Sequence, residues 1–163
     1  MAKQRGTNQQ REGNSDRVVT QNRRAFFDYF IDETVEAGLV LTGSEIKSIR
    51  EGKVTISEAY VRVDGNELWL IGANITPYVH GAYANHEPNR PRKLLVHKHQ
   101  IAQLREAAER RGMTLVPLRL RLRRGLAKVD VGVARGKKLY DKRQVQAERD
   151  ARRQIDRALS ARD

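Results

Sequence analysis

The feature that most constrains the fold is a strict alternation near the end of the chain. Residues 118–123 read LRLRLR, so leucine and arginine take turns along the backbone. Successive side chains of a β-strand point to opposite faces, so this pattern predicts a strand with one apolar and one cationic face. Arg124-Gly125 predicts a turn, and the inward face resumes at Ala127, Val129, Val131 and Val133. The segment is therefore predicted to be an antiparallel hairpin.

Further strand signals precede this hairpin. Strands are predicted at 29–33 and 36–41, with Gly38 as a bulge, and at 59–63, 67–75 and 94–96, with Asp64-Gly65-Asn66 as a hairpin turn. Thr42-x-x-Glu45 is a capping-box pattern that opens a short helix ending at Gly52, and a second amphipathic helix covers 101–108 and ends at Gly112. We therefore predict a mainly β fold: a small closed OB-like β-barrel with two or three short flanking helices.

The composition divides the chain into three parts. Residues 1–17 are almost free of apolar side chains, which predicts a flexible N-terminal segment. Residues 18–135 hold the strands and form the predicted barrel, with a proline-containing loop over 76–92. Residues 136–163 form a basic C-terminal tail.

The tail beyond Gly136 contains good helix formers but only a thin apolar stripe. We predict that it is disordered alone and becomes helical against a polyanion; the alternative is a solvated helix docked weakly on the barrel.

Charge indicates the kind of partner. The 163 residues include 32 Lys and Arg against 20 Asp and Glu, a net charge of +12. From Leu118 onward fifteen basic residues face six acidic ones, so most of the excess lies at one end. This balance predicts a polyanionic partner, either a nucleic acid or an anionic membrane surface. The tail lacks the bulky apolar face that membrane insertion needs, which favours nucleic acid.

Two readings of the arginine row at 119, 121 and 123 remain open. It is either a solvated outer face or a patch that faces phosphates. Like charges aligned on one strand repel each other and contribute nothing to folding, so we favour the phosphate-facing patch.

The sequence shows no catalytic constellation. Without cysteine, disulfides, Cys-ligated metals and thiol nucleophiles are excluded. The four histidines lack zinc-helix spacing, and no G-x-S-x-G, P-loop or dinucleotide motif occurs. We predict a protein that is not an enzyme and needs no cofactor or metal. Residues 1–17 lack the apolar stretch of a signal peptide and no apolar run reaches the length of a membrane span, so we expect a cytoplasmic protein.

Aromatic side chains are candidates for stacking on bases. Phe27 follows Arg23-Arg24 and Tyr140 follows Lys137-Lys138, so these two are the predicted stacking residues. Phe30 and Trp69 are predicted to lie in the core.

Seven ordered motifs resemble one known family, the small protein B proteins that bind transfer-messenger RNA in bacterial ribosome rescue. The motifs are Asn22-Arg23-Arg24-Ala25 with Asp28-Tyr29, EAGL at 36–39, GSEIKSIR at 43–50, ANITPY at 73–78, NHEP at 85–88, RKLLVH at 92–97 and GKKLYDKR at 136–143. The similarity runs from about residue 18 to 155.

The resemblance implies a function as well as a fold. It implies an RNA-binding adaptor that holds the tRNA-like domain of transfer-messenger RNA and reaches stalled ribosomes with elongation factor Tu. The tail would then enter the empty messenger channel and the decoding centre of the small subunit. The implied RNA-contacting residues are Glu36, Leu95 and His97, with Arg23, Arg24, Arg92 and Lys93 nearby. The implied ribosome-binding residues are Gly136, Lys137, Lys138, Tyr140, Asp141, Lys142 and Arg143.

Two other classes fit a small basic chain. A structural ribosomal protein would also be basic and tailed, but would accompany ribosomes in near-unit amounts. A membrane-surface protein would need the apolar face that the tail lacks.

Overall fold

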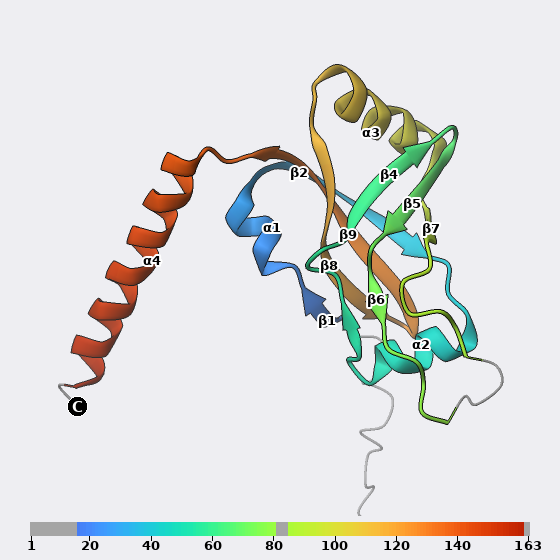
Figure 1. Cartoon of the computed structure of the whole chain (residues 1–163), viewed down its shortest axis with the longest axis horizontal. Coiled ribbons are helices and arrows are strands. Elements are labelled where there is room, and N and C mark those ends of the chain that lie inside the picture. The colour runs from blue at the N-terminus through green and yellow to red at the C-terminus, as the bar shows by residue number, and fades with distance from the viewer. Residues whose placement is uncertain (1–15, 81–84, 162–163) are drawn as a thin grey trace, which may run out of the picture.

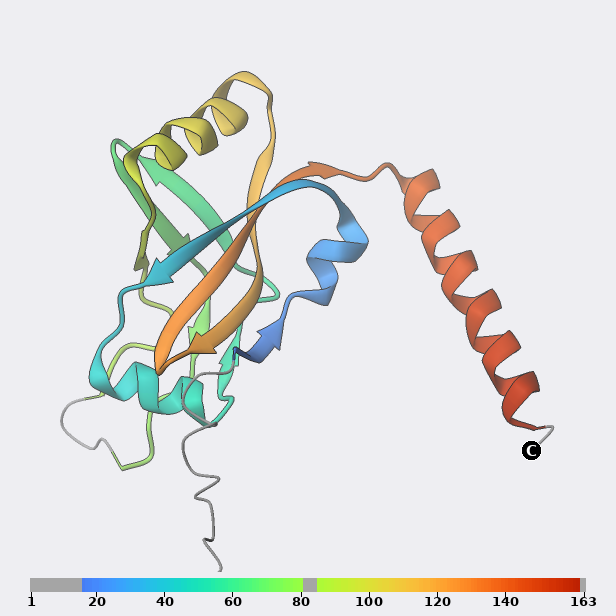
Figure 2. The same ribbon diagram turned by 180° about the vertical axis from the view of Figure 1, so that it is seen from behind.

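The computed structural model describes residues 16–80 and 85–161, except for the side chains of residues 110, 139 and 140. These residues form a strongly curved antiparallel sheet with three helices around it and a fourth helix that extends away (Figures 1 and 2). The strands are β1 (Arg17–Gln21), β2 (Tyr29–Leu39), β3 (Val54–Thr55), β4 (Tyr60–Asp64), β5 (Glu67–Ile71), β6 (Asn74–Ile75), β7 (Arg92–Leu95), β8 (Thr114–Arg123) and β9 (Leu126–Gly136). The helices are α1 (Arg23–Asp28), α2 (Gly43–Arg50), α3 (Lys98–Arg110) and α4 (Leu139–Ser160). The mainly β prediction is confirmed.

The predicted closure of the barrel is wrong for the described residues. The main sheet runs β1-β8-β9-β2-β7-β5-β4, and β3 pairs with β6 in a separate two-stranded sheet. The strands β1 and β4 are therefore open edges. β4 approaches β8 but shares no ladder with it, and β1 pairs with β8 only over Arg119–Leu122.

The β8–β9 hairpin is the longest predicted element and has the predicted turn. Arg124 and Gly125 both have positive φ, 51° and 77°, which fits the two-residue turn that matches strand twist. Val129, Val131 and Val133 are buried in the main core, as the alternation predicts.

A register shift between Pro117 and Arg119 changes which face each β8 side chain occupies. Leu120 and Leu122 lie in the main core, whereas Leu118 packs on the opposite face in a second cluster with Ala25 of α1. The three leucines therefore do not share one face. Strand β2, on the other side of β9, has a register shift between Ile31 and Glu33. The predicted bulge at Gly38 is therefore wrong.

Helix α1 covers the part of the outer face that Leu118 occupies. The Asn22 side chain caps α1 by accepting from the Ala25 amide at 3.1 Å and donates to the Pro117 carbonyl at 2.9 Å. Gly132 lies directly beneath, where an added Cβ would stand 2.8 Å from a Leu118 methyl. A larger residue at position 132 would therefore require the Leu118 side chain to shift.

A buried ion pair fixes the approach to β7. Glu45 of α2 and Arg92 of β7 are both 0% exposed, and the Arg92 Nε donates to Glu45 at 2.5 Å. Arg90 also donates to this carboxylate, and the Arg92 guanidinium donates to the carbonyls of Ala73 at 2.8 Å and Pro88 at 3.0 Å. The network ties α2, β7 and the preceding loop together.

The protonation states of this pair follow from its contacts. Burial alone would raise the pKa of Glu45, but hydrogen bonds from Arg90, the Thr42 amide and Arg92 outweigh burial and lower it from 4.5 to about 2. Burial lowers the pKa of Arg92 below its ordinary value despite the nearby carboxylate.

Both predicted flanking helices are confirmed, with boundaries close to those expected. The Thr42 amide donates to Glu45 at 2.9 Å, and Gly52 follows α2 with φ of 75°. Gly112, with φ of 62°, follows α3. The N-terminal segment predicted to be flexible lies mostly outside the described residues, and β1 begins at Arg17.

Replacing Glu45 by Gln should destabilise the protein by about 3–5 kcal/mol at neutral pH, because it leaves the buried Arg92 cation without its counter-charge. The folded-state pKa of Glu45 lies below its ordinary value, so its contribution is complete above pH 4.5 and disappears as the pH falls towards 2. Urea unfolding followed by circular dichroism between pH 2.5 and 7 tests this.

The control is Glu51→Gln, which removes an exposed ion pair with Lys53 at 3.3 Å and should change stability by less than about 0.5 kcal/mol. An equal difference between wild type and Glu45→Gln at every pH would contradict the assignment.

Candidate RNA-binding surface

The candidate surface is the outer sheet face, defined here as the side of β8, β9, β2 and β7 that is turned away from the main core and not covered by α1. Its strands place Glu36 opposite Asp130, and Gly38 between Lys128 and Leu95. Residues implied by the family resemblance therefore meet on one surface although they come from distant segments.

Arg121 is the centre of an ion-pair cluster on this face. Its guanidinium donates to Glu36 and Asp130, each at 2.6 Å, and to Asp16 at 3.1 Å. Its side chain is only 16% exposed. Partial burial would lower the pKa of Arg121, but the hydrogen bonds to Asp130 and Glu36 raise it above its ordinary value, so the group stays cationic.

All three arginines of the row have partners within the protein, and the phosphate-facing interpretation of the row stays a prediction. Arg121 is paired with three carboxylates, the Arg119 guanidinium lies 5.3 Å from the centre of the Phe26 ring, and Arg123 has Asp16 at 3.7 Å. The repulsion expected between like charges is offset by acidic and aromatic partners brought in from other strands.

Lys128 is a further candidate residue on the outer sheet face that the sequence reasoning missed. An added Cβ on Gly38 would stand 3.8 Å from the Lys128 Nζ and 3.6 Å from the Leu95 Cβ. The Lys128 ammonium group and the Leu95 side chain therefore lie on either side of Gly38 on the same face. The signal was present in the sequence, since Ala127 and Val129 face inward and Lys128 must then face outward.

Leu95 and His97 extend this surface towards α3. Leu95 is 55% exposed, an unusual position for a leucine on a sheet. The His97 ring is exposed and stacks on His99 at 5.6 Å with an angle of 10° between the rings. Lys93 is also on β7 and pairs with Glu67 at 3.4 Å. The surface therefore combines amines, an apolar side chain and flat rings.

Arg92 does not belong to this surface. It is fully buried and holds Glu45, so its predicted RNA contact is wrong and its role is structural. In a strand, Arg92 points to the opposite side from its neighbour Lys93, which explains how adjacent basic residues come to have different roles.

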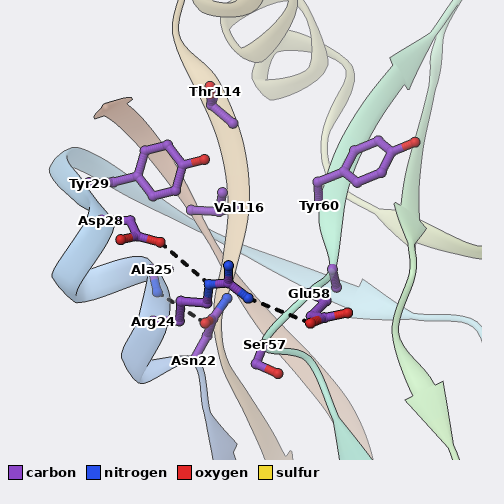
Figure 3. Close-up of a pocket in the computed structure, with 11 residues that line it drawn as sticks. Asn22, Arg24, Ala25, Asp28, Tyr29, Ser57, Glu58, Tyr60, Thr114 and Val116 are labelled. Carbon is purple, nitrogen blue, oxygen red and sulfur yellow. Dashed lines mark hydrogen bonds and ion pairs between the residues drawn. The ribbon is translucent and has the colours of Figure 1, made fainter. Parts of the chain in front are cut away.

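Arg23 and Arg24 lie on α1, and Arg24 lines a cavity of about 430 Å³ (Figure 3). Arg23 is exposed. The Arg24 guanidinium lies 3.5 Å from Asp28 and 3.5 Å from Glu58. These two arginines are separated from Glu36 by the α1-covered part of the face, so the predicted RNA-contacting residues do not form a single cluster.

The predicted ribosome-binding residues form the neck and first turn of α4. The Lys137 amide and ammonium group donate to the carbonyls of Asp28 at 2.8 Å and Phe26 at 3.2 Å. Asp141 accepts from the Lys138 amide at 3.3 Å and so caps α4. Lys142 pairs with Asp28 at 3.2 Å, whereas Gly136 and Arg143 are exposed. The side chain of Tyr140 lies outside the described part, so its predicted stacking role stays a prediction.

The aromatic assignments are partly corrected. Phe30 is 40% exposed, with Arg135 at 5.6 Å and Lys137 at 5.1 Å from its ring centre, so it does not lie in the core. Phe27 is half-buried against Arg149 of α4 at 5.6 Å. Trp69 is half-buried in β5.

Within residues 16–80 and 85–161, no three His, Asp or Glu side chains gather in a way that would hold a metal ion. In the same part of the chain, no helix is both long and apolar enough to cross a membrane.

Arg121→Gln should destabilise the protein by about 1–3 kcal/mol, because it leaves the nearly buried Asp130 without its charged partner. Arg123→Gln is the matched control from the same strand face and should cost less than about 0.5 kcal/mol, because Arg123 is exposed. Thermal unfolding of both variants tests this, and equal melting temperatures would show that the cluster contributes no stability.

Comparison with known proteins places the chain in one family. The family model described as SmpB protein matches residues 19–161. An SsrA-binding protein of Roseiflexus castenholzii is 60% identical over 148 residues, covering 90% of this chain and 94% of that protein. One from Desulfitobacterium hafniense is 50% identical over 141 residues, covering 86% and 90%.

A solved structure described as "tmRNA-SmpB: a journey to the center of the bacterial ribosome" contains a chain 50% identical to this one, with a TM-score of 0.63, covering 75% of this chain and 85% of that one. With the family model matching nearly the whole chain and relatives at this identity, the protein belongs to the SmpB family.

Proposed function

We propose that this protein is an RNA-binding adaptor, not an enzyme, that binds the tRNA-like domain of transfer-messenger RNA and delivers it to stalled ribosomes for trans-translation. The observation that carries the proposal is the meeting of Glu36, Leu95 and Lys128 on one exposed sheet surface. The names of the relatives, SsrA-binding proteins, and the tmRNA-SmpB structure support it.

The outer sheet face suits a folded RNA better than a small ligand. Its cations, Lys128 of β9 and Lys93 of β7, lie on the two strands that flank β2, a spread that suits contacts to a phosphate backbone. The Arg121 guanidinium donates to one oxygen of the Glu36 carboxylate and so holds that side chain in place. The other oxygen would accept a hydrogen bond from a base edge or a 2′-hydroxyl. In this proposal the curved open sheet acts as an OB-like platform for the tRNA-like domain.

Helix α4 suits the second task, which is to sense the ribosome. It extends away from the sheet (Figures 1 and 2), and Lys142 and Arg149 in its N-terminal half contact Asp28 and Phe27 of α1. Its 22 residues span about 33 Å as a helix. From residue 146 onward its described side chains are exposed, so the helix gains little from the sheet and remains available to another partner.

We propose that this helix enters the messenger channel when it is empty and that its first turn, with Asp141, Lys142 and Arg143, reaches the decoding centre of the small subunit. Delivery together with elongation factor Tu would occur through the bound transfer-messenger RNA. Because bacterial ribosomes work in the cytoplasm, we expect the protein to act there.

Glu36→Ala should weaken the binding of transfer-messenger RNA by about tenfold, since a hydrogen bond to a charged group is lost. Lys128→Gln should weaken binding and also reduce the slope of log affinity against log salt concentration by about 0.9, the value for one released phosphate contact. Gel-shift titrations over a range of salt concentrations measure both.

The control is Glu51→Ala, which lies in the turn after α2 and should leave affinity unchanged. Tighter binding by Glu36→Ala would mean that Glu36 only offsets positive charge, and an unchanged salt slope for Lys128→Gln would remove Lys128 from the RNA interface.

Binding and rescue should separate along the chain. Ending the chain after Lys138, or replacing Asp141, Lys142 and Arg143 by Ala, should keep transfer-messenger RNA affinity within a few-fold, because the outer sheet face is intact. Tagging of proteins on stalled ribosomes in a reconstituted translation system should be lost.

A variant with Gln144 and Gln146 replaced by Ala is the control, since it changes neutral side chains of the same helix and should still support tagging. Full tagging by the shortened chain, or failure of that chain to bind the RNA, would contradict the division.

A further inference from the structure

The open side of the sheet contains a polar cavity that the outer sheet face does not include. It lies between α1, the segment before β4 and the start of β8, and has a volume of about 430 Å³, within the range of ligand pockets (Figure 3). It exists because β1 pairs with β8 only over Arg119–Leu122. In the described chain, Thr114 and Val116 have β9 alone as a ladder neighbour, so this stretch of β8 faces the cavity as a strand edge.

One wall of the cavity is an ion pair that presents a defined set of hydrogen-bonding groups. The Arg24 guanidinium lies between Asp28 and Glu58, 3.5 Å from each (Figure 3). The Glu58 side chain is 79% exposed, so its carboxylate is hydrated and a ligand can replace the bound water. A guanidinium has several N–H donors and a carboxylate has two acceptor oxygens, so side by side they can offer one donor followed by two acceptors.

This order of groups matches one base. The Watson–Crick edge of guanine presents one acceptor, O6, followed by two donors, N1–H and the N2 amino group. Adenine and cytosine each present an amino donor beside a ring acceptor, and uracil presents one donor between two acceptors. The Arg24–Glu58 pair therefore offers guanine the same pattern that a paired cytosine offers.

The remaining walls suit a flat ring. Figure 3 shows Tyr29 and Tyr60 on opposite sides of Val116, above the ion pair. Tyr60 is 46% exposed on the edge strand β4, so its ring is accessible from solvent. RNA-binding proteins commonly stack unpaired bases on tyrosine while reading their edges with polar groups.

We propose that this cavity binds an unpaired guanine of an RNA, with its Watson–Crick edge on Arg24 and Glu58 and its ring against Tyr29 and Tyr60. This guanine pocket rests on the proposed function, because it assumes an RNA partner. The source of the guanine is either transfer-messenger RNA or ribosomal RNA, which share this chemistry.

Kethoxal footprinting tests the pocket directly, because kethoxal reacts with N1 and N2 of unpaired guanines, the two positions assigned to Glu58. One guanine should be protected by the full-length wild-type protein and become reactive again with Glu58→Gln or Tyr60→Leu. Glu51→Gln is the matched control and should protect it like wild type. The experiment is run on transfer-messenger RNA alone and on its complex with ribosomes, and the arm that shows the change identifies the source.

A second arm measures the hydrogen bond itself. Inosine lacks the 2-amino group, so inosine at the protected position should weaken wild-type binding by about threefold to tenfold. The same RNA should bind Glu58→Gln no more weakly than the unmodified RNA does, since the acceptor is already altered.

The outcomes separate the two proposals. If the wild type binds the RNA and Glu36→Ala weakens it, but Glu58→Gln and Tyr60→Leu give wild-type footprints in both arms, the guanine pocket is overturned and the proposed function stands. If the wild type binds no transfer-messenger RNA in gel shifts, both are overturned. Circular dichroism melts within about 2 °C of wild type show that loss of protection comes from the pocket and not from unfolding.

Discussion

The register shift in β8 between Pro117 and Arg119 is the constraint on which the rest of the structure depends. It turns Leu118 away from the main core, where its apolar side chain would be exposed to solvent unless another element covered it. Helix α1 covers it, and Asn22 satisfies the polar backbone of the bulge through its amide and side chain, which donate to the Leu118 and Pro117 carbonyls at 2.7 Å and 2.9 Å. The position of α1 thus follows from one irregular residue in a strand.

The same arrangement prevents closure. A strand that ends in a helix over the sheet cannot also pair with β8 along its whole length, so β1 stops at Gln21 and the start of β8 is left beside α1 and β4. Full closure would satisfy every strand edge. The protein instead keeps an opening with polar walls, at a place where a barrel of this size would be filled by side chains.

The sequence predicts the local features well because they depend on neighbouring residues. The capping box of α2, the turn at Gly125 and the inward face of Val129 and Val131 are set by interactions a few residues apart, and all are as expected. The bulges are not predictable in this way. A bulge moves the following side chains to the other face of the sheet, and it can be located only when the register with the partner strand is known.

The ion pairs of the candidate site are likewise not predictable from local sequence. The pairs Arg92–Glu45 and Arg121–Glu36 join residues 47 and 85 positions apart, so no local pattern distinguishes these arginines from ones that face solvent. The net charge of +12 predicts a polyanionic partner but does not say which cations would be available to it. Lys128 counts as one basic residue among 32 in the sequence, yet in the fold it lies beside Gly38 on the outer sheet face, where it is available to an RNA in the proposed function.

The paired arginines of the sheet and the exposed cations of α4 differ in how firmly their side chains are held. An arginine held by three carboxylates contributes a fixed hydrogen-bonding surface, whereas cations on an exposed helix contribute charge without fixed geometry. In the proposed function, the sheet would recognise one folded RNA by shape, and α4 would sample a narrow anionic channel. Since Lys142 and Arg149 of α4 contact α1 and not the outer sheet face, a change in what α4 meets need not disturb that face.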